Sequence, residues 1–374
     1  MVVGGGHPSA DELASVAVGA FGRRKVMPIE THVAGCAVCA RLLEQIYRMP
    51  GLLATVSYPP IPQQVMSRLD RALGFEAGRR AEIARREGSG ARCHGAVDSA
   101  ASLGVFDHLC WLYPSKAAFA EHALEYGADG IAAGQYVEFV GDDSTADLRS
   151  QLARAVRSIP VGRAPGAGEA AVDDIADYYQ YASDGVVDGD ATVAALQATI
   201  DDVLAAGFTG LRTVVDATPI ARTRAQREAA AREEHLFDRT VNSQRTSAMC
   251  GYSVQQIGRR VAAEMACMHP FISQGAAPFR LFAEEGADFA LAGRIDARAV
   301  ALFRKTLQRT RPPVGNELVV DARQTEAIDD RALAALEAHA ARTGRNAILR
   351  TSRSNSPSPA SLSSLPRLTV NAGP

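Results

Sequence analysis

Residues 107–140 read DHLCWLYPSKAAFAEHALEYGADGIAAGQYVEFV, in which two apolar, strand-like segments flank a helix-like segment. The apolar runs at 105–113 and 135–141 predict buried strands, and 115–130 has helical spacing and ends at a glycine. The alternation continues, with further helices predicted at 144–158, 193–207, 222–242 and 254–266 and further strands at 211–217 and 247–252. Alternation of this length predicts an α/β domain with a mostly parallel sheet that is covered by helices on both faces.

The last third of the chain has its own pattern of strands and helices. Two short strand-like segments, 279–284 and 288–296, are separated by EGA, which suits a hairpin turn. They precede a helix at 297–309, a strand at 316–322, a helix at 329–343 and a strand at 346–352. We therefore expect a second, C-terminal α/β module. The serine- and proline-rich segment 353–374 is predicted to be a disordered tail.

Composition limits the classes of function. The 374 residues include 40 basic and 42 acidic side chains, a formal charge of −2, which disfavours a global nucleic-acid or membrane-surface binder. No apolar run reaches the roughly 18 residues of a transmembrane helix, and the first residues do not resemble a secretory signal. Six cysteines are too few for a disulfide framework. We expect a reduced, cytoplasmic protein that binds neither nucleic acid nor membrane directly.

Two stretches mark the boundaries of an N-terminal domain. Adjacent prolines in SYPPIPQ (57–63) exclude a continuing helix, and GSGA (88–91) reads as a flexible joint. The segment between them, 64–87, is helix-prone, and the stretch 68–92 is rich in arginine: Arg68, Arg71, Arg79, Arg80, Arg85, Arg86 and Arg92. Interspersed acidic residues favour a solvated linker helix over a basic stripe. The domains expected are 1–85, a small helical domain with its linker helix, then 102–275 and 278–352, followed by the tail.

A histidine and two cysteines in the first domain have the spacing of metal ligands. His32, Cys36 and Cys39 form an HxxxCxxC motif, whose side chains share one face if the segment is a single helix. They supply three of the four ligands of a tetrahedral zinc site, and His7 in HPSADEL is a candidate for the fourth. Ser9 or Asp11 can cap the helix that follows it. The alternative is a pair of small buried cysteines beside an unrelated histidine.

The segment 7–47, which carries this motif, resembles the zinc-binding anti-sigma domain family. Members have a histidine before a first helix and HxxxCxxC at the start of another. The resemblance implies that His7, His32, Cys36 and Cys39 are zinc ligands and that zinc is the cofactor. It also implies a group IV sigma factor as partner, which some family members release on thiol oxidation, whereas others are insensitive to redox state.

The central domain also contains histidines and cysteines, but their spacing alone decides nothing. His108 and Cys110 alternate along a predicted strand and therefore share a face, while Cys250 and His269 lie near the ends of later elements. A second metal site is conceivable from these groups. On spacing alone, ordinary core and strand-end residues are the favoured interpretation.

The same segments resemble the MEDS family. The resemblance rests on the stretch at 107–140, GFTGLRTVVD (207–216), AMCGYS (248–253) and MHP (268–270), in that order. It implies a sensory domain of RecA/KaiC-like α/β architecture that binds a small ligand. The candidate ligand-pocket residues that it suggests are His108, Cys110, Glu234, Cys250, Tyr252 and His269.

The sequence lacks the motifs of common enzymes. There is no GxxxxGK[ST] phosphate loop, and GDDSTAD (141–147) would place carboxylates where a phosphate would sit. A GxSxG nucleophile elbow and a dinucleotide fingerprint are also missing. The acidic pairs 173/174, 201/202 and 233/234 are sequence neighbours, which point about 100° apart on a helix. We interpret them as solvated faces and expect no enzymatic activity.

The C-terminal module resembles a STAS domain, the fold of anti-sigma-factor antagonists. The resemblance rests on GRID (293–296), VVDA (319–322) and the helix start IDDRAL (328–333). Phosphorylatable members begin this helix with D-S-S-G-L, where this chain has Asp329, Asp330 and Arg331 followed by Ala-Leu. Both hydroxyls are missing, so phosphorylation at the usual position, here Arg331, is not expected. The resemblance implies a kinase-type anti-sigma partner bound near these three residues, and Asp329 can cap the helix.

Together these features predict a non-enzymatic regulator of sigma-factor activity. A ligand- or redox-sensing central domain would be coupled to partner binding by the zinc domain and the STAS-like module. Two alternatives stay open: a nucleotide-binding RecA-like switch or enzyme, and a one-component DNA-binding regulator. The second rests on the arginine-rich segment 68–92 and is opposed by the near-neutral charge and the absence of a helix-turn-helix pattern.

Overall fold

The computed structural model describes residues 7–9, 12–13, 16, 29, 31–48, 92–101, 103–142, 169–311 and 315–373. The chain divides into two compact units, Met1–Glu76 and Ala77–Pro374. The predicted break at 57–63, the linker helix at 64–87, the joint at 88–91 and the helix at 144–158 lie outside the described residues. Within the described ranges, none of the helices combines the length and the apolar content needed to cross a bilayer.

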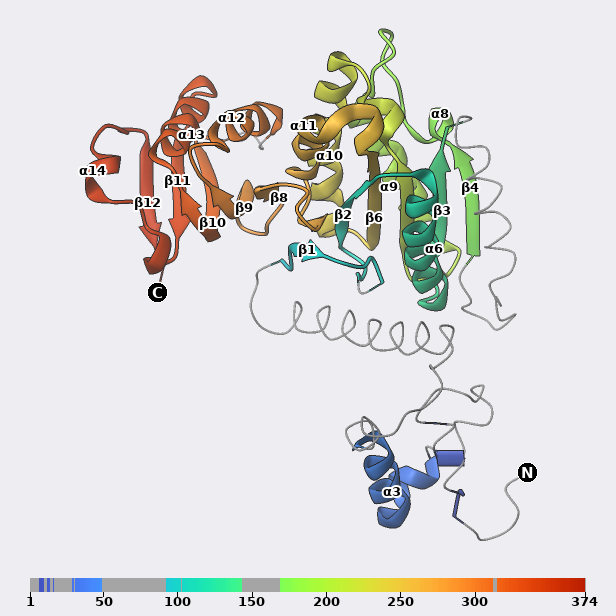
Figure 1. Ribbon diagram of the computed structural model, residues 1–374. Helices are drawn as coiled ribbons and strands as arrows, with labels where there is room; N and C mark the ends of the chain where they lie inside the picture. The colour runs from blue at the N-terminus through green and yellow to red at the C-terminus, as the bar shows by residue number, and fades with distance from the viewer. Residues whose placement is uncertain are drawn as a thin grey trace. The chain divides into compact units, whose positions relative to one another are not determined.

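In the first unit, the HxxxCxxC motif lies across the junction of two helical segments. Residues 31–35 are helical, Cys36 is not, and α3 then runs from Ala37 to Arg48 (Figure 1). The segment is therefore not a single helix, so the shared face of one helix is not what brings His32, Cys36 and Cys39 together. The break leaves the backbone N–H groups at the start of α3 open to side chains that precede it.

The second unit contains a seven-stranded sheet in which every strand pairing is parallel, as the sequence predicted. The strand order is β1-β7-β2-β6-β5-β3-β4. The strands are β1 (Gly95–Val97), β2 (His108–Tyr113), β3 (Tyr136–Gly141), β4 (Glu169–Asp174), β5 (Leu211–Asp216), β6 (Thr246–Ser253) and β7 (Phe271–Ser273). Strands β1, β4 and β7 were not predicted. Two of them have only three residues, which is too short for a periodic signal.

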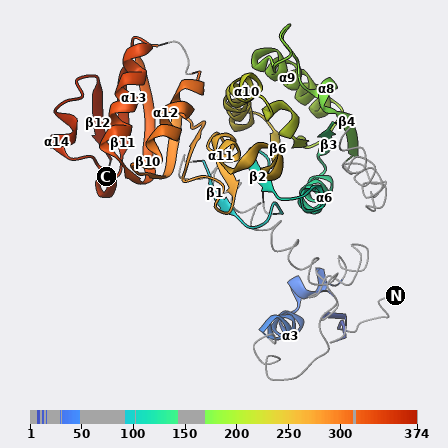
Figure 2. The same ribbon diagram turned by 45° about the horizontal axis from the view of Figure 1, so that its top comes forward.

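Helices cover both faces of this sheet. The helices are α6 (Lys116–Ala132), α8 (Ile175–Tyr178), α9 (Gly189–Ala205), α10 (Arg224–Ser243) and α11 (Val254–Ala266). On one face, α6 packs Phe119 and Tyr126 against Val214. On the other face, α9 and α10 pack against Val215, the next residue of β5. Adjacent residues of one strand thus enter opposite cores, as the two-residue period of a strand requires. Figure 2 shows α6 on one side of the sheet and α9 and α10 on the other.

One glycine allows α6 to approach the sheet closely. A Cβ atom at Gly251 in β6 would lie 2.3 Å from Cε2 of Phe119, which real Cβ contacts do not show. The absence of a side chain at this position therefore lets the Phe119 ring of α6 lie directly on β6.

A second sheet of five strands follows, in the order β12-β11-β10-β9-β8. Its strands are β8 (Phe279–Phe282), β9 (Phe289–Ile295), β10 (Glu317–Ile328), β11 (Asn346–Thr351) and β12 (Leu368–Ala372). The antiparallel pair β8–β9 is the predicted hairpin, and the remaining pairings are parallel. Helices α12 (Val300–Arg309) and α13 (Asp330–Arg342) connect β9 to β10 and β10 to β11.

The predicted disordered tail at 353–374 is wrong. Strand β12 pairs in parallel with β11, and a short helix, α14 (Pro359–Leu362), precedes it. Leu365 and Leu368 are buried in the core of the second sheet. These leucines provide the apolar surface needed for packing. The prediction of disorder relied on the overall composition of the segment, in which serines and prolines outnumber the leucines.

Buried charges join α12 to the helices of the seven-stranded sheet. Arg309 on α12 is fully buried and its Nη2 atom lies 3.0 Å from Oε1 of Glu228 on α10 and 2.9 Å from Oε2 of Glu264 on α11. Because a buried guanidinium is costly without partners, these ion pairs hold the two sheets of the second unit together at a defined position.

Candidate functional site

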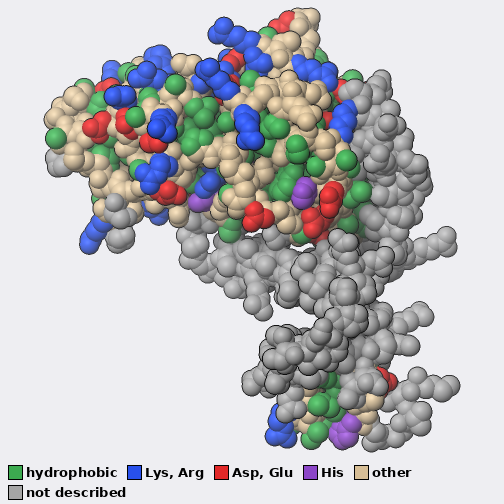
Figure 3. All heavy atoms as spheres, viewed as in Figure 1, with side chains coloured by type: hydrophobic (Ala, Val, Ile, Leu, Met, Phe, Trp, Pro, Cys, Tyr) green, Lys and Arg blue, Asp and Glu red, His purple; other side chains and the backbone are tan. Residues whose placement is uncertain are grey.

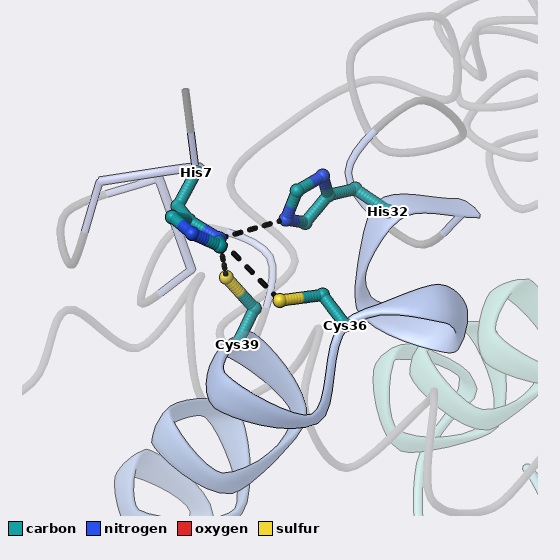
Figure 4. Close-up of side chains that lie close together, drawn as sticks. All are labelled: His7, His32, Cys36 and Cys39. Atoms are coloured by element: carbon teal, nitrogen blue, oxygen red, sulfur yellow. Dashed lines mark hydrogen bonds between the residues drawn. The ribbon is translucent and has the colours of Figure 1, made fainter. Parts of the chain in front are cut away.

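The side chains of the predicted zinc ligands converge in the first unit. Nδ1 of His7 lies 3.2 Å from Nε2 of His32, 3.4 Å from Sγ of Cys36 and 3.3 Å from Sγ of Cys39 (Figure 4). All four candidate ligand atoms lie within 4.8 Å of one another. The edges of a tetrahedron around zinc, with bonds of about 2.0–2.3 Å, are about 3.3–3.8 Å long. The three contacts to His7 are close to that range.

Local structure positions each of these groups. Ser9 begins the helix after His7 with a capping box: its Oγ accepts from the N–H of Glu12 (3.2 Å), and the Glu12 carboxylate accepts from the N–H of Ser9 (2.8 Å). The prediction that Ser9 caps this helix is confirmed. Cys36 directly precedes α3, and Cys39 lies in its first turn.

The two thiols differ in acidity. A hydrogen bond from the backbone N–H of Cys39 lowers the pKa of the Cys36 thiol below its ordinary value. Burial, together with the neighbouring Cys36, raises the pKa of Cys39. A thiolate is the form that binds a metal, and a helix N-terminus favours it. With two imidazoles and two thiols at one point, the donor set fits a closed zinc site.

A second cluster forms in the core of the seven-stranded sheet and contains five of the six predicted pocket residues. His108 begins β2, Cys250 and Tyr252 lie two residues apart on β6, Glu234 projects from α10, and His269 lies between α11 and β7. Each is at most 3% exposed. Sequence reasoning placed them on separate elements, and the fold brings them together between the sheet and α10.

Glu234 lies at the centre of this cluster. Its Oε2 atom is 3.1 Å from Nε2 of His108, 3.2 Å from Nε2 of His269 and 3.6 Å from Sγ of Cys250. Its other oxygen, Oε1, accepts a hydrogen bond from the Tyr252 hydroxyl. The ligand atoms of His108, Glu234, Cys250 and His269 all lie within 4.8 Å of one another.

The sixth predicted residue, Cys110, is buried but does not belong to this group of ligand atoms. It lies directly across from Cys250 in the register of β2 and β6. Strand register therefore places the two cysteines next to each other, but only Cys250 belongs to the group formed with Glu234 and the two histidines.

Two residues that the sequence did not assign to a site support the cluster. Oδ1 of Asp238 lies 3.1 Å from Nδ1 of His108, and Oδ2 of Asp238 accepts from Nη1 of Arg92 at 2.7 Å. Asp238 lies one helical turn after Glu234, so the i, i+4 spacing of two acids on one helix was the available signal. Arg92 was placed in a solvated linker, but it is 4% exposed because its charge pairs with Asp238.

The acidic pair at 233/234 is likewise not a solvated face, and that interpretation is corrected. Glu233 is 2% and Glu234 is 1% exposed. Burial and the charge of Glu234 raise the pKa of Glu233 well above its ordinary value. Both residues are covered because α10 packs against the sheet and also against the neighbouring helix α9, so two of its faces are buried.

Opposite charges set the acidities within the cluster. Burial alone would raise the pKa of Glu234, but the nearby rings of His269 and His108 together bring it below its ordinary range. Burial would likewise raise the pKa of Asp238, and Arg92 and His108 lower it. Burial lowers the pKa of His269. Burial and Glu234 raise the pKa of the Cys250 thiol well above its ordinary value.

The predicted partner-binding residues Asp329, Asp330 and Arg331 lie at the start of α13. Oδ1 of Asp329 accepts from the backbone N–H of Arg331 at 2.9 Å, so the predicted helix cap is confirmed. Asp330 and Arg331 are exposed. The loop at 141–147, where carboxylates were expected to repel a phosphate, lies outside the described residues after Asp142.

Comparison with known proteins bears on the central region. Residues 107–270 match the family model described as MEDS: MEthanogen/methylotroph, DcmR Sensory domain. This confirms the MEDS resemblance, and the matched range includes all six predicted pocket residues. No curated protein was found to match the chain. The match does not extend to either end, so the zinc anti-sigma and STAS resemblances stay predictions.

Proposed function

We propose that this protein is a non-enzymatic signalling regulator, in which the MEDS sensory domain controls how the two ends of the chain bind protein partners of the sigma-factor system. The observation that carries the proposal is the sensory-family match at 107–270. The partners expected are a sigma factor at the N-terminal unit and a kinase-type anti-sigma factor at the C-terminal sheet.

The N-terminal unit would bind zinc through His7, His32, Cys36 and Cys39. Their convergence supports this assignment, because three of the four lie on an HxxxCxxC motif and the fourth joins them from a separate segment. Zinc would hold the segment around His7 against α3 and so fix a fold that a small domain cannot stabilise by its core alone.

A continuous set of contacts gives the sensory core a route to the C-terminal sheet. Asp238, which bonds His108, also accepts from the backbone N–H of Ala283, the residue after β8, at 2.6 Å. Arg92 donates to the Ala283 carbonyl oxygen at 3.2 Å. A change at His108 can therefore alter the position of β8 and of the segment that begins at Arg92, which leads back to the first unit. Such a change acts as a signal when two states bind a partner with different affinity.

The charge distribution supports protein partners over nucleic acid. On the face shown in Figure 3, basic side chains are distributed among acidic, apolar and other ones. The formal charge of the chain is −2. A protein that binds DNA through its backbone phosphates needs a concentrated basic surface.

Co-purification tests this function. The zinc-loaded full-length chain is expected to retain a sigma factor or a kinase-type anti-sigma factor from its own cell, identified by mass spectrometry. Cys36→Ser/Cys39→Ser should lose the sigma factor, because the N-terminal unit no longer holds zinc. Cys93→Ser is the matched control, since Cys93 is also a free, partly exposed thiol, and it should bind normally. Retention of neither protein class by the zinc-loaded chain would refute the proposal.

A further inference from the structure

The cluster around Glu234 has the dimensions of a metal site. Oε2 of Glu234 lies 3.1 Å from Nε2 of His108 and 3.2 Å from Nε2 of His269. Sγ of Cys250 lies 3.5 Å from Nε2 of His108 and 3.6 Å from Oε2 of Glu234. In a tetrahedral zinc site the Zn–N and Zn–O bonds are about 2.0–2.1 Å and the Zn–S bond is about 2.3 Å. Two nitrogen or oxygen ligand atoms then lie about 3.3 Å apart, and a sulfur lies about 3.6 Å from a nitrogen or oxygen. The shorter edges involve nitrogen and oxygen and the longer edges involve sulfur, as observed.

The hydrogen bonds of the two histidines direct their lone pairs into the cluster. Nδ1 of His108 faces the Asp238 carboxylate at 3.1 Å, and Nδ1 of His269 faces the Met265 carbonyl oxygen at 3.0 Å. Because both oxygens only accept, each Nδ1 carries a proton, and Nε2, which faces Glu234, is the ring nitrogen whose lone pair is available to a metal ion when it carries no proton. Nε2 of His269 is fully buried and, within the described part of the chain, makes no hydrogen bond of suitable geometry. Lone pairs that face a carboxylate repel it unless a cation lies between them.

The charges of the cluster also suit a divalent ion. Binding of the metal would displace the thiol proton of Cys250, and the resulting thiolate and Glu234 together would cancel the two positive charges of the ion. The remaining buried charges, Asp238 and Arg92, form their own pair at 2.7 Å with side chains at most 1% exposed. A buried group of ions is stable when it is neutral overall and fully coordinated.

The surroundings also suit an ion better than an organic ligand. The four side chains are at most 3% exposed and their ligand atoms lie within 4.8 Å of one another, which leaves room for a single ion. Asp238 on His108 is the carboxylate partner that metal-bound histidines commonly have, and the Tyr252 hydroxyl holds the second oxygen of Glu234.

We propose that His108 Nε2, Glu234 Oε2, Cys250 Sγ and His269 Nε2 bind a divalent transition-metal ion, with Zn²⁺ as the ion that this mixed nitrogen, oxygen and sulfur set fits best. The metal lies in the core of the sensory domain and is independent of the N-terminal zinc site. Four protein ligands leave no open position, so the ion organises the domain and links β2, β6, α10 and the segment after α11.

Metal analysis of the full-length chain tests this site in a background that lacks the N-terminal ligands. The chain is incubated with Zn²⁺ under reducing conditions, desalted, and measured by inductively coupled plasma mass spectrometry. The wild type should hold about two zinc ions per chain and Cys36→Ser/Cys39→Ser about one. Adding Cys250→Ser and His269→Gln to that variant should remove the remaining ion.

Cys110→Ser in the same background is the matched control. Cys110 is as deeply buried as Cys250 and lies beside it, yet it is outside the cluster, so this variant should still hold about one zinc ion. Circular dichroism and the fluorescence of Trp111, the single tryptophan, report whether each variant is folded. With Co²⁺ in place of Zn²⁺, absorption bands of a tetrahedral site with one thiolate should appear and should vanish with Cys250→Ser.

Two results would overturn the proposal. One is a Cys36→Ser/Cys39→Ser variant whose second unit is folded but retains no metal after loading, which would leave a buried, protonated charge network as the explanation of the cluster. The other is metal content that survives Cys250→Ser/His269→Gln. Neither result affects the N-terminal zinc assignment, which is measured by the difference between the wild type and the first variant.

Discussion

His32, Cys36 and Cys39 occupy positions 32–39 of the chain, whereas His108, Glu234, Cys250 and His269 are spread over positions 108–269. The first group is completed by His7 and lies on a small unit, in which His7 is exposed and Cys39 is the one buried ligand of the four. The second lies in the core of a large sheet, and all four of its side chains are buried. Both groups combine imidazole and thiol at similar separations. What differs is whether local structure or the whole fold holds the ligands together.

This difference predicts how each site responds to the loss of its metal. A site on a small unit supplies much of the stability of that unit, so removing the ion unfolds the unit. A site assembled from the sheet, α10 and the segment after α11 rests on a scaffold with large apolar cores, so the scaffold should persist without the ion. The predictions below test this contrast, beginning with the largest effect.

Cys36→Ser/Cys39→Ser should unfold the N-terminal unit and leave the second unit intact. Structural zinc contributes about 10–16 kcal/mol of binding free energy in small zinc domains, which is far more than the folding free energy that such a unit has without the metal. Far-UV circular dichroism should show a loss of helix, whereas the urea midpoint followed by Trp111 fluorescence should not move. Trp111 lies in β2 and reports only on the second unit. A shift of that midpoint would show that the two units are not independent in stability.

Arg92→Ala should destabilise the second unit by about 3–5 kcal/mol, because it leaves the Asp238 carboxylate buried without its positive partner. Urea unfolding followed by Trp111 fluorescence measures the loss. The control is Arg294→Ala, which removes an ion pair to Glu326 whose side chains are 57% and 66% exposed. That change should cost less than about 1 kcal/mol. Equal costs for the two variants would contradict the burial argument.

Asp238→Asn should weaken zinc binding at the central site by about 10- to 100-fold, since the group that orients His108 loses its charge. Competition with a zinc chelator measures the affinity in the Cys36→Ser/Cys39→Ser background. Asp216→Asn is the control, because Asp216 is also buried but bonds Tyr113 and Thr218 at the end of β5. An equal loss in both variants would indicate general destabilisation and no specific support of the metal.

The helices and strands that the sequence predicted share one property: the residues of each element by themselves show the apolar periodicity or the turn residues of that element. The strand at 211–217, the helix at 254–266 and the hairpin at 279–296 carry apolar periodicity or a turn signal, and all are present. Strand β7 has three residues and β12 lies in a serine-rich segment, so neither produced such a signal. Their pairing with β2 and β11 depends on contacts between distant parts of the chain.

The candidate sites follow the same division. The HxxxCxxC motif was found from its spacing, and its ligand atoms converge although the helix is broken at Cys36. The partners Arg92 and Asp238 were missed, because the chain gives no local reason to bring position 92 to position 238. Glu233 and Glu234 were misread as solvated, since a pair of acids on a helix is usually exposed. Only the packing of α10 against both the sheet and α9 reverses that expectation.

Asp329 belongs with the local features, and it provides the smallest test of the contrast. Its carboxylate accepts from the backbone N–H of Arg331 at the start of α13, a contact that the sequence predicted from three consecutive residues. Asp329→Ala should cost about 1 kcal/mol, as for other helix caps. Arg331→Ala is the control: it keeps the N–H group that Asp329 caps and removes only an exposed side chain, so stability should change by less than about 0.5 kcal/mol. If Arg331→Ala abolishes binding of a kinase-type partner while stability is unchanged, the two neighbouring residues have separate roles, one in the fold and one in recognition.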